Sequence, residues 1–97
     1  MNTMLIPTDA AEVASVLRIG YGKMYGGPSR DWAEDLCDYA ARKLSGFPQQ
    51  VAQTVAKYRK CSDKQADIIA RAMVADRIMV NRGLRIALSN KCEEVTI

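Results

Sequence analysis

The fold is decided by residues 47–73, FPQQVAQTVAKYRKCSDKQADIIARAM, which carry the signals for two consecutive helices. Proline is well tolerated in the first turn of a helix, so Phe47-Pro48 predicts the start of the first one. Lys57-Tyr58-Arg59-Lys60 predicts its end, because basic residues are favourable at a helix C-terminus. Between these limits the inward positions recur at helical spacing, at Val51, Ala52, Val55 and Tyr58.

The second helix of this pair begins at Ser62-Asp63-Lys64-Gln65, which has the spacing of a capping box. In a capping box the serine hydroxyl accepts a hydrogen bond from the glutamine N–H, and the glutamine side chain reaches back to the serine N–H. Asn81-Arg82-Gly83 predicts the end, so we expect the longest helix of the chain over residues 63–81. Its inward positions are Ile69, Ala72, Met73, Asp76, Met79 and Val80, and the carboxylate of Asp76 requires a partner there.

Two more helices are expected before this pair. Thr8 or Asp9 can cap the first, whose apolar face holds Val13, Val16, Leu17, Tyr21 and Met24. Gly26-Gly27-Pro28-Ser29 is a break, after which we expect Ser29 to cap a helix of about 15 residues closed by Ser45-Gly46. The inward positions of that helix are Trp32 or Ala33, Leu36, Cys37, Ala40 and Leu44.

The tail over residues 84–97 fits two structures. Residues 84–88 and 95–97 alternate like strands, but a short fifth helix fits equally well. An isolated hairpin is marginal in water, so such strands would pack on the helices or pair with Met4-Leu5-Ile6. The sequence therefore predicts a single all-α domain over residues 1–97, a compact bundle of four to five helices with the option of a short C-terminal β-hairpin. We expect flexible ends at residues 1–7 and 93–97.

Composition excludes several classes of protein. With 97 residues, 48% of them hydrophobic and 26% charged, the chain has room for one globular domain. Histidine is absent, and the three cysteines (Cys37, Cys61 and Cys92) form no CxxC pair, so we expect no enzyme, no metal and no cofactor. The odd cysteine count, the lack of a secretory signal and the lack of an apolar run of about 20 residues predict reduced thiols and a cytoplasmic location.

Charge is distributed unevenly, although the net charge is only +3. Residues 1–40 sum to −3, residues 41–92 to +8 and residues 93–97 to −2. A concentration of Lys and Arg is the usual footprint of phosphate binding, and a solvated helix face is the alternative. We assign nucleic-acid binding to Lys57, Tyr58, Arg59, Lys60, Lys64, Arg71 and Arg77, with Arg42, Lys43 and Arg85 extending the same positive region.

The second helix carries an acidic stripe with a tryptophan beside it. The carboxylates either solvate an outer face or dock a basic partner, and a straight stripe converges too poorly to hold a metal. The residues assigned to protein binding are Asp31, Trp32, Glu34, Asp35 and Asp38. For Trp32 core packing is the favoured role, whereas Tyr58 is either a base-stacking residue or a core residue. Opposite charge on opposite faces would also permit head-to-tail homo-oligomers.

Residues 47–73 also resemble a group of small uncharacterised helical proteins from phages and other mobile elements. The shared pattern is an apolar helix, a basic turn and S-x-K-Q at the start of a long helix, here Ser62-Asp63-Lys64-Gln65. The likeness covers about a quarter of the chain and implies an accessory protein that acts on host or defence machinery in the host cytoplasm.

Two functions follow from these features. In the first, a non-enzymatic accessory protein docks on nucleic acid or a nucleoprotein complex through the basic face of the helices at about 48–60 and 63–81. In the second, the protein is an inhibitor or adaptor of the anti-defence type, which binds a host or defence protein through its acidic helix and its tail. Neither reading involves a membrane.

Overall fold

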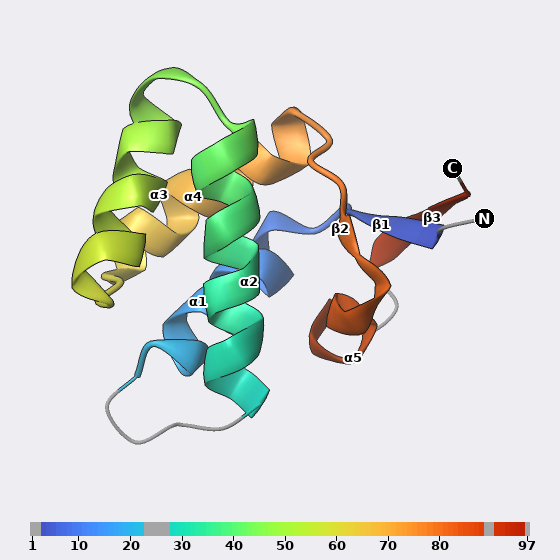
Figure 1. The fold of residues 1–97 in the computed structure, drawn as a ribbon, viewed down its shortest axis with the longest axis horizontal. Helices are drawn as coiled ribbons and strands as arrows, with labels where there is room; N and C mark the ends of the chain where they lie inside the picture. Colours follow the sequence, from blue (N-terminus) through green and yellow to red (C-terminus); the bar gives the residue numbers. More distant parts are fainter. Residues whose placement is uncertain (1–2, 23–27, 89–90, 97) are drawn as a thin grey trace.

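The protein is a helical globule with a small sheet at one side (Figure 1). The computed structural model describes residues 3–22, 28–88 and 91–96, and helices make up 69% of them. The body is formed by α1 (Ala10–Gly20), α2 (Pro28–Lys43), α3 (Gly46–Tyr58) and α4 (Asp63–Ala75). The smaller elements are β1 (Thr3–Pro7), β2 (Val80–Asn81), the 3-10 turn η1 (Arg82–Leu84), α5 (Arg85–Leu88) and β3 (Cys92–Thr96).

The core lies between the four long helices, because α1 and α3 each pack against both α2 and α4. Most of the expected inward positions are confirmed: Val13, Leu17, Ala33, Leu36, Cys37, Ala40, Leu44, Val51, Ala52, Val55, Ile69 and Met73 are all buried. Within the described ranges, no polar or charged side chain is buried. None of the helices in these ranges combines the length and apolar character needed to cross a membrane.

Two of the three expected helix caps are confirmed. Asp9 caps α1, where its carboxylate accepts a hydrogen bond from the N–H of Ala11 at 2.9 Å. The capping box of α4 is complete, since Gln65 N–H donates to Ser62 Oγ at 3.1 Å and Ser62 N–H donates to Gln65 Oε1 at 2.9 Å. The expectation that Ser29 caps α2 is wrong, because α2 begins one residue earlier, at Pro28. Proline lacks an N–H and has its φ fixed near the helical value, which suits this first position. The predicted glycine break at residues 26–27 and the expected apolar residue Met24 lie outside the described residues.

Both ends of the chain enter one antiparallel sheet, with the order β2-β1-β3. Leu5, in the central strand, pairs with Val80 on one side and Glu94 on the other, and its side chain is fully buried. Of the two structures that the sequence allows for the tail, the short fifth helix is confirmed at residues 85–88. The C-terminal strand β3 pairs with Met4-Leu5-Ile6 of β1, which the sequence also allows, and not with residues 84–88. Residues 3–7 and 92–96 are paired strands, and Thr3 pairs with Thr96, so the described ends of the chain lie side by side (Figure 1). The flexibility expected for residues 1–7 and 93–97 stays a prediction.

The last predicted helix is shorter than expected. It ends at Ala75, with Asp76 as C-cap and Arg77 in a left-handed conformation (φ 50°). With 13 residues it is also shorter than α2, which has 16. The apolar pattern continues to residue 80 for another reason, namely that Val80 is a buried strand residue paired with β1. Asp76 is exposed, so its carboxylate needs no protein partner.

Gly20, the last residue of α1, lies against α2 with no room for a side chain. A Cβ atom at this position would lie 2.2 Å from Ala33 Cβ and 2.4 Å from the carbonyl oxygen of Ser29. Neither of these atoms is the end of a flexible side chain, so neither can move aside cheaply. The C-terminal end of α1 can therefore touch the first turns of α2 only because residue 20 has no side chain.

The substitution Gly20→Ala should lower the free energy of unfolding by about 1–3 kcal/mol, because it overpacks this contact. Urea denaturation followed by circular dichroism measures the loss. Gly83→Ala is the matched control, since its Cβ would meet only the movable side chain of Asn81, at 3.1 Å. Equal losses in the two variants would contradict the role given to Gly20.

Candidate functional site

The turn between α3 and α4 carries basic side chains on a backbone fixed at both ends. Arg59 takes a left-handed conformation (φ 55°, ψ 38°), and its N–H donates to the carbonyl of Val55 at 2.8 Å, which ends α3. The capping box at Ser62 fixes the start of α4 three residues later. Arg59 and Lys60 are thereby presented from a short segment held by a helix on each side.

Beside this turn the surface is hollowed, with a volume of about 540 Å³. Three of the lining side chains are cationic, and they come from two separate elements: Arg30 from α2, and Arg59 and Lys60 from the turn. Arg30 is already paired with Glu34 of α2 at 3.2 Å. The other lining residues are Tyr21, Gly22, Cys61, Ser62 and Gln65. The hollow therefore offers guanidinium and ammonium groups together with hydroxyl and amide donors, which is the chemistry that binds phosphate oxygens.

The seven residues assigned to nucleic-acid binding do not form one surface. Four of them lie at or next to the turn and are exposed: Lys57, Arg59, Lys60 and Lys64. Within the described ranges, none of these four has a carboxylate at ion-pair distance. Arg71 pairs with Asp67 at 3.2 Å, and Arg77 pairs with Glu93 at 2.8 Å. The 13 residues of α4 span about 20 Å, so Arg77 lies at the far end of the helix from the turn.

The expected extension of the positive region does not reach the turn. Lys43 lies with Arg77 around a different hollow, next to Met4 of β1. Arg85 pairs with Glu94 of β3. The sheet end of the molecule thus has its own basic residues, and two of them are neutralised by the acidic strand β3.

Tyr58 lies on the surface and not in the core. Its side chain is 63% exposed, and the ammonium group of Lys57 lies 5.4 Å from the centre of its ring. The expectation that Tyr58 points inward is wrong, because it is the last residue of α3 and lies one turn beyond Val55, the last buried residue of that helix. An exposed aromatic ring among unpaired cations remains available for stacking.

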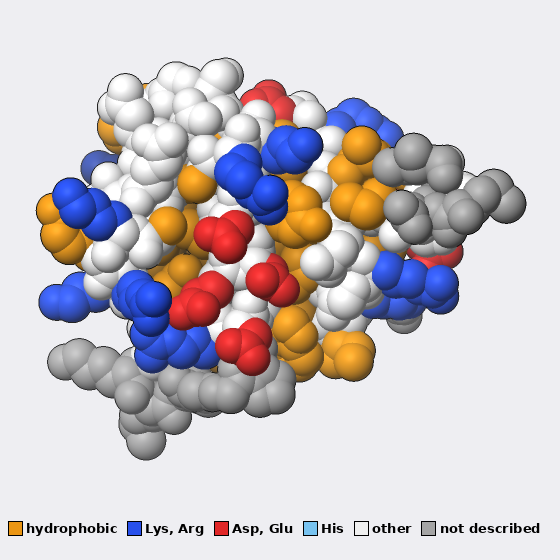
Figure 2. Space-filling view, viewed as in Figure 1, with side chains coloured by type: hydrophobic (Ala, Val, Ile, Leu, Met, Phe, Trp, Pro, Cys, Tyr) orange, Lys and Arg blue, Asp and Glu red, His pale blue; other side chains and the backbone are white. Residues whose placement is uncertain are grey.

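The acidic stripe lies on the solvent side of α2, next to the basic turn (Figure 2). Glu34 and Asp38 line a cleft of about 190 Å³ together with Arg59, Tyr21 and Ala56. The two charges are therefore adjacent, and not on opposite faces as the head-to-tail interpretation requires. Across the described ranges, no three acidic or cysteine side chains come together as metal ligands.

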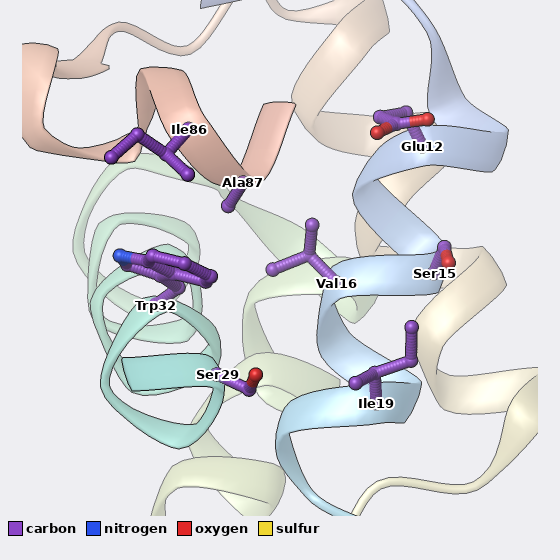
Figure 3. A pocket seen from close by; sticks show the side chains of 8 residues that line it. All are labelled: Glu12, Ser15, Val16, Ile19, Ser29, Trp32, Ile86 and Ala87. Carbon is purple, nitrogen blue, oxygen red and sulfur yellow. The ribbon is translucent and has the colours of Figure 1, made fainter. Parts of the chain in front are cut away.

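Trp32 lies on the other flank of α2, where it lines a groove of about 210 Å³ (Figure 3). The indole is half-buried and packs against the core, as expected, but one side of it faces the groove. Val16 and Ile19 of α1 face it across the groove, and Ile86 and Ala87 of α5 lie on the same side as the indole (Figure 3). Ile86 is 77% exposed and Ile19 is 44% exposed.

Sequence reasoning missed several of these residues. Arg30 lies 27 residues or more from the basic run, and only the fold brings it beside Arg59. Ile86 belongs to the tail, whose structure the pattern left open. Ile19 carried a usable signal, because it follows Val16 by three residues and extends the apolar stripe of α1 by one turn.

Two of the cysteines, Cys37 and Cys61, lie in surroundings that disfavour the thiolate. Cys37 is fully buried, and its thiol donates to the carbonyl oxygen of Ala52, 3.2 Å away. Burial raises the pKa of Cys37 to about 11, and burial also raises the pKa of Cys61 to about 11. Because the thiolate is the reactive form, neither residue is set up as a nucleophile at neutral pH.

Comparison of the chain with protein-family models, with curated proteins and with solved structures finds no match.

Thiol labelling tests the cysteine assignment. At pH 8, a thiol with a pKa of about 11 is roughly one part in a thousand thiolate, so Cys37 and Cys61 should react on the order of 100-fold more slowly than a free thiol. The rate should rise as the pH approaches 11. Iodoacetamide labelling with peptide mapping gives each rate, and denatured protein is the control. Rapid labelling of Cys61 in the folded protein would contradict the assignment.

Proposed function

We propose that this chain is a non-enzymatic accessory protein that docks on nucleic acid or a nucleoprotein complex through the basic turn between α3 and α4. The observation that carries the proposal is the hollow in which Arg59 and Lys60, neither of them in an ion pair within the described ranges, lie beside Arg30, which is paired with Glu34. The resemblance of residues 47–73 to phage and mobile-element proteins suggests the setting. The docking surface proposed is smaller than the sequence suggested, since Arg71 and Arg77 are already paired.

Binding of this kind is mainly electrostatic. Four exposed cations at the turn, Lys57, Arg59, Lys60 and Lys64, can each contact a phosphate. On duplex DNA each neutralised phosphate contributes about −0.9 to the slope of log affinity against log salt, so the four together predict a slope of about −3.6. Glu34 and Asp38 lie beside Arg59 and limit the affinity by repelling phosphate.

Charge reversal at the turn is the direct test. In the double variant K60E/K64E, the affinity for a labelled 20-base-pair duplex should fall, and the salt slope should shrink by about 2, because two phosphate contacts are lost. Fluorescence anisotropy measures both quantities. The salt concentration is varied from about 50 to 200 mM, because phosphate contacts weaken strongly over this range.

The matched control for net charge is K43E/R82E. Both of these residues are exposed and neither lines the hollow. The control should keep nearly the wild-type slope. If the two double variants weaken binding equally, only net charge matters and the turn is not the site. If the wild-type protein binds no oligonucleotide at low salt, the proposed function is wrong.

The exposed ring of Tyr58 leads us to expect a preference for single-stranded nucleic acid, because unpaired bases are free to stack on it. Tyr58→Ala should weaken binding to an oligo-dT by about 5- to 100-fold, because base–aromatic stacking is worth roughly 1–3 kcal/mol. Tyr58→Phe should retain the affinity. Phe47→Ala is the control, since Phe47 is 64% exposed at the other end of α3. An unchanged affinity in Tyr58→Ala would show that Tyr58 stacks on no base and that phosphate contacts alone account for the binding.

A further inference from the structure

The Trp32 groove is a second surface with the features of a binding site. One wall is formed by Trp32 and Ser29 of α2 together with Ile86 and Ala87 of α5, and the opposite wall by α1 (Figure 3). Its volume of about 210 Å³ is below the roughly 300–1,000 Å³ of sites that enclose small molecules. It is therefore suited to a bulky apolar side chain presented by a larger partner.

Two of the apolar residues that line the groove are exposed, and each lies near the end of its helix or in a short one. Ile19 lies one turn beyond the buried Val16, and α5 is only four residues long. Ile86, the most exposed large apolar side chain of the described chain at 77%, forms its outer edge. Apolar groups are thus held in place around a half-buried indole, and aromatic residues of this kind often dominate the energy of an interface.

One carboxylate lines the groove, and two more lie beside Trp32 on α2. Asp31 and Asp35 flank Trp32 on α2, both are exposed, and within the described ranges neither has a basic group at ion-pair distance. Glu12 lines the groove on the side of α1. Of the cations near α5, Arg85 pairs with Glu94 and Lys91 pairs with Asp9 at 3.0 Å, whereas Arg82 is exposed and does not line the groove.

We propose that this groove binds a basic amphipathic helix of a partner protein. An apolar side chain of the partner would enter between Ile86 and Ile19 and pack on Trp32. Lysine or arginine residues on its flanks would meet Asp31, Asp35 and Glu12. Helices commonly bind grooves through apolar residues at such spacing, and opposite charge at the rim speeds association and selects the partner. A phosphate backbone is repelled here by the same carboxylates, so the site is distinct from the basic turn.

The chain carries a built-in reporter for this site, because Trp32 is its single tryptophan. The probe is a synthetic helical peptide with leucines at positions i, i+3 and i+4 and with lysines on its flanks, free of tryptophan and tyrosine. Titration should give a saturable blue shift of the Trp32 emission as the indole loses water. The same peptide with glutamate in place of lysine should bind at least about 10-fold more weakly, since like charges now meet at the rim.

Two variants locate the binding and test its charge. Ile86→Asp should weaken binding of the lysine peptide at least about 10-fold without changing the Tm, because the side chain is exposed in the free protein. Phe47→Asp, at an exposed apolar residue on another element, should bind like wild type. The double variant D31K/D35K should reverse the preference, so that the glutamate peptide binds more tightly.

Other outcomes overturn the proposal. No change in emission with either peptide, or equal shifts with both, would exclude a basic partner. A blue shift of the Trp32 emission that appears without peptide, as the protein concentration rises, would show that a second copy of the chain occupies the groove. A shift produced by an oligonucleotide and lost in Ile86→Asp would make the groove part of the nucleic-acid surface instead.

Discussion

The contact between Gly20 and the first turns of α2 determines where both candidate surfaces lie. Because residue 20 has no side chain, α1 can press against Ser29 and Ala33. On one flank of this contact, α1 faces Trp32 and forms the apolar groove. On the other flank, Tyr21 and Gly22 meet Arg30 and form part of the basic hollow. A wider separation of the two helices would open both sites at once, so the packing of a single glycine underlies the functional surface.

The outer face of α2 separates these two surfaces electrostatically (Figure 2). Asp31 and Asp35 lie beside Trp32 on α2, and Glu34 and Asp38 line the cleft that they share with Arg59 of the turn. The arrangement favours a basic protein segment on the first flank and a polyanion on the second. A nucleoprotein complex contains both kinds of ligand, and the two proposals are therefore compatible. Adjacent opposite charges also weaken each other's electric field, because Glu34 and Asp38 lower the positive potential at Arg59.

Helices were predictable from the sequence wherever local chemistry determines them. The capping box at Ser62 and the apolar spacing of the four long helices depend only on nearby residues, and both are confirmed. The errors occur where distant segments meet. Val80 continues a helical period but pairs with Leu5, which lies 75 positions earlier, and no local pattern contains that pairing. Tyr58 has the right spacing for the core, but α3 extends one turn beyond the helices that would cover it.

The charge pattern of the sequence predicts a basic region but not the neighbours of its residues in the fold. Arg77 and Arg85 belong to the basic segment, yet each meets a glutamate of β3 because the C-terminal strand folds back beside β1. These pairings remove two cations from the expected face and leave the turn as the concentrated part of it. The groove is harder to foresee, since Ile19, Trp32 and Ile86 come from three elements and each alone is an unremarkable apolar residue. Their significance arises from convergence beside unpaired carboxylates, which is a property of the fold and not of any one segment.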